Sequence, residues 1–343
     1  MDQNQMQSYW MQQNEDASLL EQRSVPVPVP GARQLLVRVR AASLNRGEFV
    51  AGHGLHGALG SWKAIGGECS GEVVALGEGT TGFAIGDRSM GRCAGAFAEY
   101  ALIDAAEAMH VPAALSWEEA GSIPLTFLVS YDMLVLQGGL EAGQWVLING
   151  VSSGVGVASL QLAKALGAQV IGTSGSREKL ELLASLGLDL GIPTRAPDFS
   201  GQVLEATAGK GVNLAINTVG GTVFAESIRC LAFEGKLATV GYVDGVVHGD
   251  IDLGALHARR LTVFGVSNKL RSKAQKSAAV PRFVAEVLPL FASGRIRPRI
   301  DEVVDFAHLA QAKARMEAGA HAGKIVLRMP TQTSATVHQE TNQ

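Results

Sequence analysis

The residues with the clearest chemical pattern lie in a glycine-rich segment near the middle of the chain. This segment, Asn149-Gly-Val-Ser-Ser-Gly-Val-Gly156, follows an apolar run at 145–148 that is typical of a buried parallel strand. An apolar-periodic segment then runs as far as Gly167, and residues 169–173 form a second strand candidate. A glycine turn between a strand and a helix, inside such a strand–helix–strand unit, favours dinucleotide binding, with the pyrophosphate over the N–H groups that start the helix.

The glycine pattern itself is incomplete. In a G-x-G-x-x-G frame over residues 151–156, only the last glycine, Gly156, is present, and Ser153 takes the place of the second. A loop without a ligand is the alternative, but the surrounding elements favour the dinucleotide site. We predict that the Ser153 side chain points away from the pyrophosphate or bonds to it. The predicted pyrophosphate turn consists of Ser152, Ser153, Gly154, Val155 and Gly156.

The end of the second strand bears on the choice between NADH and NADPH. A site selective for NADH places an acidic residue there, to bind the ribose 2′-hydroxyl. The chain has Ser174 and Gly175 instead, followed by Arg177 and Lys179, whose charges suit a 2′-phosphate. The alternative is that residues 177–179 form an ordinary solvated first turn of a helix.

Length and composition are those of a two-domain enzyme. The 343 residues exceed one typical core, and the net charge of −3 favours neither nucleic acid nor a membrane as a partner. Three cysteines, far apart in the sequence, indicate a reducing compartment without a disulfide framework. No secretory signal and no apolar stretch of membrane length is visible, so we expect a cytoplasmic protein.

The elements follow two patterns along the chain. Up to about residue 110, short strands between turns predict a β-rich partial barrel, with a well-alternating strand at 34–42 and another at 95–102. Ser116 and Glu119 have the spacing of a capping box, and beyond them strands alternate with helices, which predicts a doubly wound parallel sheet. Further strands are expected at 188–192, 212–218, 236–242, 261–267, 303–306 and 323–328, and helices at 176–186, 222–233, 279–293 and 306–318.

Seven segments resemble, in order, the zinc-independent medium-chain dehydrogenase/reductases of the quinone oxidoreductase type. They are VRAASLN at 39–45, GFAIGD at 82–87, GAFAEY at 95–100, IPLTF at 123–127, LINGVSSGVG at 147–156, NTVGG at 217–221 and GKIVL at 323–327. The resemblance covers residues 8–328. It implies an α/β protein with a GroES-like partial β-barrel catalytic domain from 1–127 and 269–343, and a Rossmann domain from 128–268. It also implies a homodimer.

The resemblance bears on zinc as well. A catalytic zinc needs three protein ligands of the Cys, His or carboxylate type. Zinc-dependent relatives place a Cys where this chain has Asn45 and a His where it has Gly67, so we expect no metal. His53 and His56 are the only pair with metal-like spacing, and solvated or substrate-facing histidines are favoured there.

The family also implies further residues around the cofactor. These are Asn45, Thr126, Gly241, Tyr242, Phe264, Gly265, Val266 and Lys324, with Gly175 and Lys179 at the 2′-phosphate. Alternatives stay open: Thr126 can bond its own helix, Asn45 can close a turn, and Lys324 can be a surface residue. Thr194 departs from the family, which often has a Tyr at that position.

These features predict an oxidoreductase in which NADPH brings a hydride to a small quinone or α,β-unsaturated carbonyl, without metal. Asn45 or water would meet the developing oxygen charge, and Tyr131 and His56 are candidate proton donors. A non-catalytic NADPH-binding protein with a redox-sensing or interaction role is the main alternative, since the glycine frame is altered and the Tyr is missing. An alcohol dehydrogenase is disfavoured by Asn45 and Gly67.

Overall fold

The apolar run before the glycine turn is the middle of a six-stranded parallel sheet. A computed structural model describes residues 4–14, 18–49 and 60–330, and in it this run is strand β9 (Trp145–Asn149). Its neighbours are β10 (Gln169–Ser174) and β12 (Val212–Asn217). The full strand order is β11-β10-β9-β12-β13-β14, with β11 at Leu190–Pro193, β13 at Leu231–Thr239 and β14 at Thr262–Gly265.

Helices cover both faces of this sheet, which explains why β9 is apolar throughout rather than alternating. Val146 and Ile148 belong to one buried cluster, and Leu147 belongs to another on the opposite face. Along the described chain the helices are α1 (Trp117–Ala120), α2 (Pro124–Tyr131), α3 (Gly154–Ala165), α4 (Arg177–Ala184), α5 (Ser200–Ala206), α6 (Phe224–Arg229), α7 (Leu253–Ala258), α8 (Lys273–Ser277), α9 (Val280–Glu286), α10 (Leu288–Ala292) and α11 (Leu309–Glu317). Of these, α1 and α11 pack on strands outside this sheet. A π-helical segment follows α2 at Asp132–Gln137, and 3₁₀ turns lie at Arg46–Glu48, Gly221–Val223 and Phe306–His308.

A second sheet takes strands from both ends of the chain. Its order is β15-β16-β3-β5-β6-β8, and β7 pairs with β3. The C-terminal strand β16 runs antiparallel to β3, with Val326 opposite Ser43. This pairing brings Lys324 of β16 close to the residues that follow β3. The bounds are β3 Gln34–Ser43, β5 Glu68–Leu76, β6 Arg88–Arg92, β7 Tyr100–Asp104, β8 Ala108–His110, β15 Ile300–Asp305 and β16 Lys324–Arg328.

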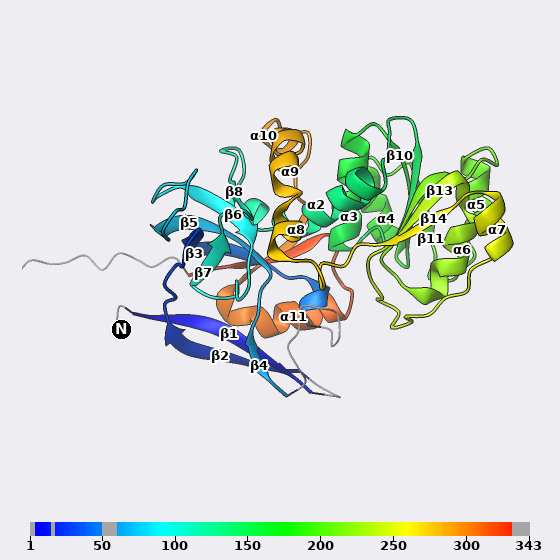
Figure 1. Ribbon diagram of the computed structural model, residues 1–343. Coiled ribbons are helices and arrows are strands. Elements are labelled where there is room, and N and C mark those ends of the chain that lie inside the picture. The colour runs from blue at the N-terminus through cyan, green and yellow to red at the C-terminus, as the bar shows by residue number, and fades with distance from the viewer. Residues whose placement is uncertain (1–3, 15–17, 50–59, 331–343) are drawn as a thin grey trace, which may run out of the picture.

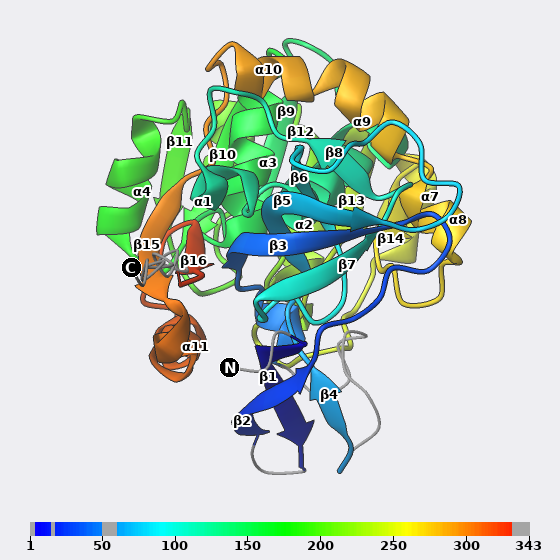
Figure 2. The ribbon, with the colours of Figure 1, turned by 90° about the vertical axis from the view of Figure 1, so that its left-hand side faces the viewer.

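A small third sheet, in the order β2-β1-β4, completes the antiparallel half of the molecule. Its strands are β1 (Gln5–Gln13), β2 (Ser18–Pro26) and β4 (Trp62–Ala64), and it lies at the lower end of the view in Figure 2. In Figure 1 the antiparallel strands lie on the left and the parallel sheet on the right, with α2, α8 and α9 between them. The two halves therefore meet along one boundary.

Most predicted elements are confirmed, and the GroES-like barrel with a Rossmann sheet is the observed fold. The capping box at Ser116 and Glu119 is present, with Ser116 Oγ accepting from the Glu119 N–H. The domain boundaries stay predictions, and the one at 127/128 falls inside α2. Within the described residues, no helix has the length and apolar character that a membrane crossing requires.

The strand predicted at 236–242 runs from Leu231 to Thr239 as β13, and three other predicted elements are wrong in their extent for identifiable reasons. The helix expected at 222–233 ends at Arg229, because Leu231 pairs with Val212 in the sheet and strand pairing overrides helix propensity. The helix expected at 279–293 is broken into α9 and α10, since Pro289 in the first turn of α10 cannot donate a backbone hydrogen bond. The strand expected at 95–102 starts only at Tyr100, and Gly95 has a φ of 75° that no regular strand adopts.

Candidate active site and cofactor cleft

The glycine-rich turn starts α3 in the way that a phosphate-binding turn requires. Ser153 is the N-cap of α3, and its Oγ accepts from the Gly156 N–H at 3.0 Å. The hydroxyl at the doubtful glycine position therefore points at the helix start and satisfies a backbone donor. The N–H groups of Gly154 and Val155 lie in the first turn of a twelve-residue helix, where the helix dipole favours an anion.

Gly156 has a packing role rather than the predicted contact with the cofactor. A Cβ at this position would lie 2.4 Å from the carbonyl oxygen of Gly150, closer than real Cβ atoms come. Gly156 does not line the cavity that the turn faces. The missing side chain allows α3 to pack against the turn, and Gly150 itself has a φ of 74°.

A cavity of about 2060 Å³ extends from this turn between the two halves of the molecule. Fourteen of the predicted site residues line it: Asn45, Thr126, Ser152, Ser153, Gly154, Val155, Ser174, Gly175, Lys179, Gly241, Tyr242, Gly265, Val266 and Lys324. Phe264 does not, because its side chain packs against the core cluster on that side of the sheet. The carboxyl ends of β9, β10, β12, β13 and β14 meet at this cavity, as expected for a ligand site in a doubly wound sheet.

The end of β10 is polar and not acidic, as the sequence indicates. Ser174 Oγ lies 3.2 Å from Ser152 Oγ, which joins this strand end to the glycine-rich turn. The predicted 2′-phosphate ligand Lys179 is already engaged, since its ammonium donates to the carbonyl oxygens of Gly319 and His321 at 2.5 and 2.7 Å. Lys179 thus connects α4 to the loop after α11. One N–H of its ammonium remains to donate to an anion.

Arg195 is a site residue that the sequence reasoning missed. It lines the cavity just beyond β11, and a Cβ on Gly175 would lie 2.1 Å from its Nε, so the guanidinium lies directly against the end of β10. Among the described residues the guanidinium has no hydrogen-bond or ion-pair partner. One feature of the sequence could have pointed to Arg195: it directly follows Thr194, where the family often has a Tyr. These residues fit a dinucleotide with a 2′-phosphate: a capped helix start for the pyrophosphate and a fork-shaped cation for the phosphate.

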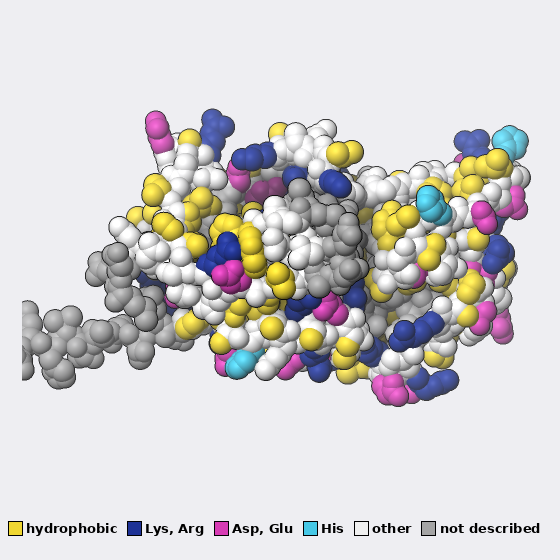
Figure 3. Space-filling model, turned by 90° about the horizontal axis from the view of Figure 1, so that it is seen from below, with side chains coloured by type: hydrophobic (Ala, Val, Ile, Leu, Met, Phe, Trp, Pro, Cys, Tyr) yellow, Lys and Arg dark blue, Asp and Glu magenta, His cyan; other side chains and the backbone are white. Residues whose placement is uncertain are grey.

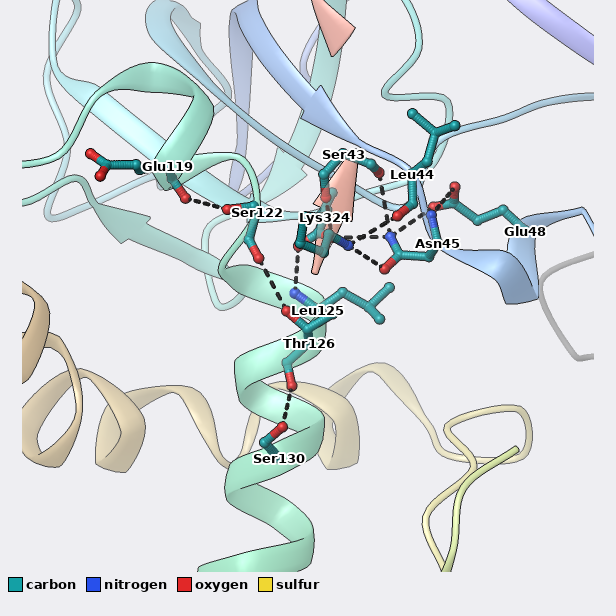
Figure 4. A network of polar contacts seen from close by, with 11 residues as sticks. Ser43, Leu44, Asn45, Glu48, Glu119, Ser122, Leu125, Thr126, Ser130 and Lys324 are labelled. Carbon is teal, nitrogen blue, oxygen red and sulfur yellow. Dashed lines mark hydrogen bonds and ion pairs between the residues drawn. The ribbon is translucent and has the colours of Figure 1, made fainter. Parts of the chain in front are cut away.

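A buried lysine and a buried carboxylate form the polar centre of the barrel side of the cleft (Figure 4). Lys324 is 5% exposed and Glu68 is fully buried. The Lys324 ammonium donates to Glu68 Oε1 at 2.9 Å, to Asn45 Oδ1 at 2.6 Å and to the Leu44 carbonyl at 3.0 Å. All three N–H groups are used, so Lys324 is a fixed positive charge rather than a surface residue or a free donor.

Glu68 ties four elements together. It accepts from Ser43 Oγ at the end of β3 at 2.6 Å, from the Leu125 backbone N–H in α2 at 2.7 Å and from Asn45 Nδ2 at 3.0 Å. The Asn45 side-chain amide also approaches Glu48 Oε1 at 3.3 Å. Asn45 lines the cavity as predicted, but its amide hydrogens are directed to carboxylates of the protein and not to the open cleft.

Glu48 adds a second buried carboxyl to this network. Its Oε2 accepts from the Asn45 backbone N–H at 3.2 Å, and the side chain is 3% exposed. Burial raises the pKa of Glu48 to about 7, while the charge of Lys324 opposes this rise. The carboxyl therefore changes its charge near neutral pH.

The positions that correspond to zinc ligands in the zinc-dependent relatives are occupied differently. At the first of these positions, Asn45 Oδ1 accepts from the Lys324 ammonium at 2.6 Å. A Cβ on Gly67 would lie 2.7 Å from Glu48 Oε1, so the Glu48 carboxyl takes the space that a side chain at 67 needs. Within the described ranges no group of three or more His, Cys, Asp or Glu side chains is arranged to hold a metal. The His53–His56 pair lies outside the described residues.

Two of the predicted catalytic residues have other roles in the structure. Thr126 lines the cavity, but its Oγ1 donates to the Ser122 carbonyl at 3.1 Å, which is the alternative of a helix residue that bonds its own backbone. Tyr131 as a proton donor is wrong. Its hydroxyl donates to Glu286 Oε2 at 2.6 Å, away from the cavity lining, and burial together with Glu286 raises its pKa. Tyr131 lies one helical turn beyond Phe127 in α2, and its side chain points toward α9 rather than into the cavity.

Two cysteines far apart in sequence meet beside the cleft. Cys69 Sγ and Cys93 Sγ are 3.6 Å apart on neighbouring strand segments, and Cys93 lines the cavity. The contact with Cys69 and burial both raise the pKa of Cys93, so this thiol stays protonated at neutral pH. The expectation that the cysteines are scattered holds for the sequence and not for the fold.

Comparison with known proteins agrees with this architecture. Residues 31–113 match the alcohol dehydrogenase GroES-like domain, and residues 154–284 match the zinc-binding dehydrogenase family. A quinone oxidoreductase of Pseudomonas aeruginosa is 31% identical over 311 residues, which cover 90% of this chain and 95% of that protein. A mycobacterial protein solved in complex with NADPH has a TM-score of 0.84 at 28% identity, over 94% of this chain and 99% of that one.

Much longer proteins are similar as well. A phenolphthiocerol/phthiocerol polyketide synthase of Mycobacterium tuberculosis is 30% identical over 302 residues, or 88% of this chain. This chain spans only 14% of that synthase. Fold, site and relatives together define a reductase-type Rossmann protein with a GroES-like barrel. The chain belongs to the medium-chain dehydrogenase/reductase superfamily, of the quinone oxidoreductase type.

Proposed function

We propose that this protein is an NADPH-dependent oxidoreductase that reduces a quinone or an α,β-unsaturated carbonyl compound without a metal. The observation that carries the proposal is that the capped start of α3 lines the same cavity as Asn45 and Lys324, which Glu68 holds from behind. One end suits a dinucleotide and the other a small polar substrate. The Pseudomonas aeruginosa quinone oxidoreductase, similar over nearly its whole length, supports the reaction class.

NADPH is favoured over NADH by the charges at the end of β10. Ser174 offers no carboxylate for a ribose 2′-hydroxyl, and Arg195 supplies a guanidinium beside it that no described residue engages. Gly154 and Val155 would hold the pyrophosphate, and Gly241, Gly265 and Val266 would lie near the nicotinamide. The mycobacterial neighbour with NADPH bound supports this choice.

In the reaction we propose, bound NADPH supplies a hydride to an electron-poor carbon, and one proton completes the reduction to a quinol or a saturated carbonyl. The negative charge that develops on the substrate oxygen would lie near the Lys324 ammonium, which the surrounding acceptors hold in place and whose charge the Glu68 carboxylate partly offsets. Lys324, Asn45 and Thr126 donate their hydrogens within the protein, so water delivers the proton.

The test is oxidation of NADPH by the purified protein with a panel of small quinones and enones. We expect loss of the reduced-nicotinamide absorbance that depends on both protein and substrate, and that a chelator leaves unchanged. A strictly chelator-sensitive rate would contradict the metal-free mechanism. Reduction of NADP⁺ by simple alcohols, with none of the quinones or enones reduced, would indicate an alcohol dehydrogenase instead.

The second candidate is a non-catalytic NADPH-binding protein. It is favoured by one observation: the donors of Asn45, Thr126 and Lys324 are all satisfied inside the protein, so none of these three offers a hydrogen to a substrate. The same panel separates the two candidates. Tight NADPH binding by calorimetry, without oxidation by any compound, would support the binding protein and refute the reductase.

A further inference from the structure

Three lysines that lie close together in the sequence line the α8 end of the cleft. Lys269, Lys273 and Lys276 line the cavity, and none of their side chains has a hydrogen bond or ion pair within the part of the chain that the structure describes. Lys273 and Lys276 are three residues apart on α8, so they lie on the same side of this helix. Like charges at this spacing repel one another. An anion bound between the two ammonium groups would attract both and offset this repulsion.

The helix that carries two of these lysines is held firmly against the barrel. Ser272 and Gln275 form a capping box at its start, with Gln275 N–H donating to Ser272 Oγ at 3.2 Å. Arg92, at the end of β6, donates to the Lys276 carbonyl at 2.8 Å. Figure 1 places α8 between the antiparallel strands and the parallel sheet. The backbone of Lys273 and Lys276 is therefore held in place at the boundary between the two halves.

The acids of the cavity lining do not neutralise this end. Glu107 is paired with Arg92 at 2.6 Å, and Asp244 accepts from the Thr222 N–H and hydroxyl. Asp104, the third acid, forms no ion pair with any residue in the described ranges and caps its own turn through the Ala106 N–H. Asp104 and Asp244 are therefore the two lining carboxylates without a cation partner among the described residues, beside three lysines. On the face seen in Figure 3, basic and acidic side chains are mixed.

The type of cation indicates the type of anion. Lysine ammonium groups are compact point charges on flexible stems, and several of them together suit the several charged oxygens of a phosphate. The cofactor phosphates have their own site at α3 and Arg195. The lysine end is continuous with the wall formed by Cys93 and Ala94 and with Asn45, where the substrate would lie.

We propose that Lys269, Lys273 and Lys276 form a subsite for the phosphate groups of a thioester substrate. The substrate class of this cleft is then an α,β-unsaturated acyl group on a phosphorylated pantetheine arm, either free coenzyme A or the arm of a carrier. This inference rests on the proposed reductase function and narrows it. The acyl group would reach the Asn45–Lys324 network while the phosphate stays at the lysines.

The first experiment compares three thioesters as substrates with NADPH: crotonoyl-CoA, crotonoyl-4′-phosphopantetheine and crotonoyl-pantetheine. We expect kcat/KM to be about tenfold higher for the phosphorylated compounds, and to fall with added salt only for these. If kcat/KM is equal for crotonoyl-phosphopantetheine and crotonoyl-CoA and higher than for crotonoyl-pantetheine, the phosphate of the arm is recognised. If kcat/KM is higher for crotonoyl-CoA than for crotonoyl-phosphopantetheine, free coenzyme A is the source. Equal values for all three compounds would overturn the proposal.

The second experiment uses the double substitution Lys273→Gln and Lys276→Gln. The ratio of kcat/KM for crotonoyl-CoA to that for a neutral enone should fall about tenfold, because two exposed charge pairs are lost. Lys210→Gln, an exposed lysine outside the cavity, is the matched control and should leave this ratio unchanged. The same fall in both variants would refute the subsite.

A binding measurement separates this inference from the proposed function. Calorimetry with coenzyme A and with pantetheine, in saturating NADP⁺ to block the cofactor site, should show binding of coenzyme A that the double substitution weakens. If the protein reduces no compound but keeps this lysine-dependent binding, the reductase function fails and the subsite stands. If the protein reduces neutral enones but shows no such binding of coenzyme A, the reductase function stands and the subsite is refuted.

Discussion

At the scale of single residues, the charge beside the end of β10 decides the cofactor. The sequence places Lys179 there, in the first turn of the next helix, but the fold directs its ammonium to the Gly319 and His321 carbonyls. Arg195 reaches the same place because β11 pairs with β10 in parallel, with Ser174 opposite Pro193. Arg195 is far from Ser174 in sequence, so only strand pairing brings them together.

We expect Arg195→Ala to raise the KM for NADPH about tenfold and to leave the KM for NADH unchanged, because one charge-assisted hydrogen bond to the 2′-phosphate is lost. Steady-state kinetics with both cofactors measures this. Arg295→Ala, at an exposed arginine that does not line the cavity, is the control and should leave both KM values unchanged. An equal change for both cofactors would show that Arg195 does not read the phosphate.

At the scale of elements, the start of α3 depends on a close approach that only glycine allows. The carbonyl of Gly150 lies where a Cβ of Gly156 would be, and this carbonyl belongs to the backbone, which cannot rotate away as a side chain can. The incomplete glycine frame is therefore compatible with a phosphate-binding turn. Its one retained glycine, Gly156, is the position that packing demands, while Ser153 serves as a cap.

Gly156→Ala is expected to destabilise the protein by about 2 kcal/mol, since the added methyl group must displace backbone. It should also weaken NADPH binding, because the turn moves with the helix. Gly201→Ala, at a helical site with nothing within 4 Å of the new Cβ, is the matched control and should be neutral or slightly stabilising. Urea unfolding compares the variants. Wild-type stability for Gly156→Ala would contradict the packing argument.

At the scale of the whole molecule, the two chain ends are joined through buried charges. β16 brings Lys324 to Glu68 of β5, and Glu68 also holds the Leu125 N–H of α2 next to the parallel sheet. The stability of the barrel should therefore depend on the charge of Glu48, which the same network holds. The homodimer and the cytoplasmic location implied at the level of sequence stay predictions.

The pKa of Glu48 predicts a loss of stability as the pH rises. Burial raises this pKa from 4.5 to about 7, so between these values the folded protein holds a proton that the unfolded chain has released. One pKa unit corresponds to about 1.4 kcal/mol. Burial of this carboxyl therefore lowers the free energy of unfolding by about 3 kcal/mol more at about pH 7.5 than at about pH 4.5. The loss continues to grow until the pH exceeds the folded value.

Glu48→Gln removes this titration. The free energy of unfolding of the variant, relative to wild type, should therefore increase by about 3 kcal/mol from about pH 4.5 to about pH 7.5. The difference between the two proteins is the quantity to measure, because other groups titrate in the same range. His321, whose pKa burial lowers from 6.5 to about 4, destabilises both proteins as the pH falls below 6.5. A difference that does not change with pH would contradict the assignment.

Local patterns in the sequence were enough to predict the elements and most of the cavity lining. Strand β9, the α3 turn, the capping box at Ser116 and the end of β10 are such patterns, because periodicity, caps and glycines act over a few residues. Together with a family resemblance, they predicted the barrel and Rossmann halves and fourteen lining residues.

The roles of the polar side chains, by contrast, could be assigned only from the fold. Tyr131 turns to Glu286, Thr126 bonds its own helix, and Lys179 is held by the loop after α11. A long side chain bonds to whatever lies within a few ångströms of its end, and that neighbour often comes from a distant part of the chain. Sheet pairing and helix packing set these neighbours, so Arg195 and the Glu48–Glu68–Lys324 network became visible only in three dimensions.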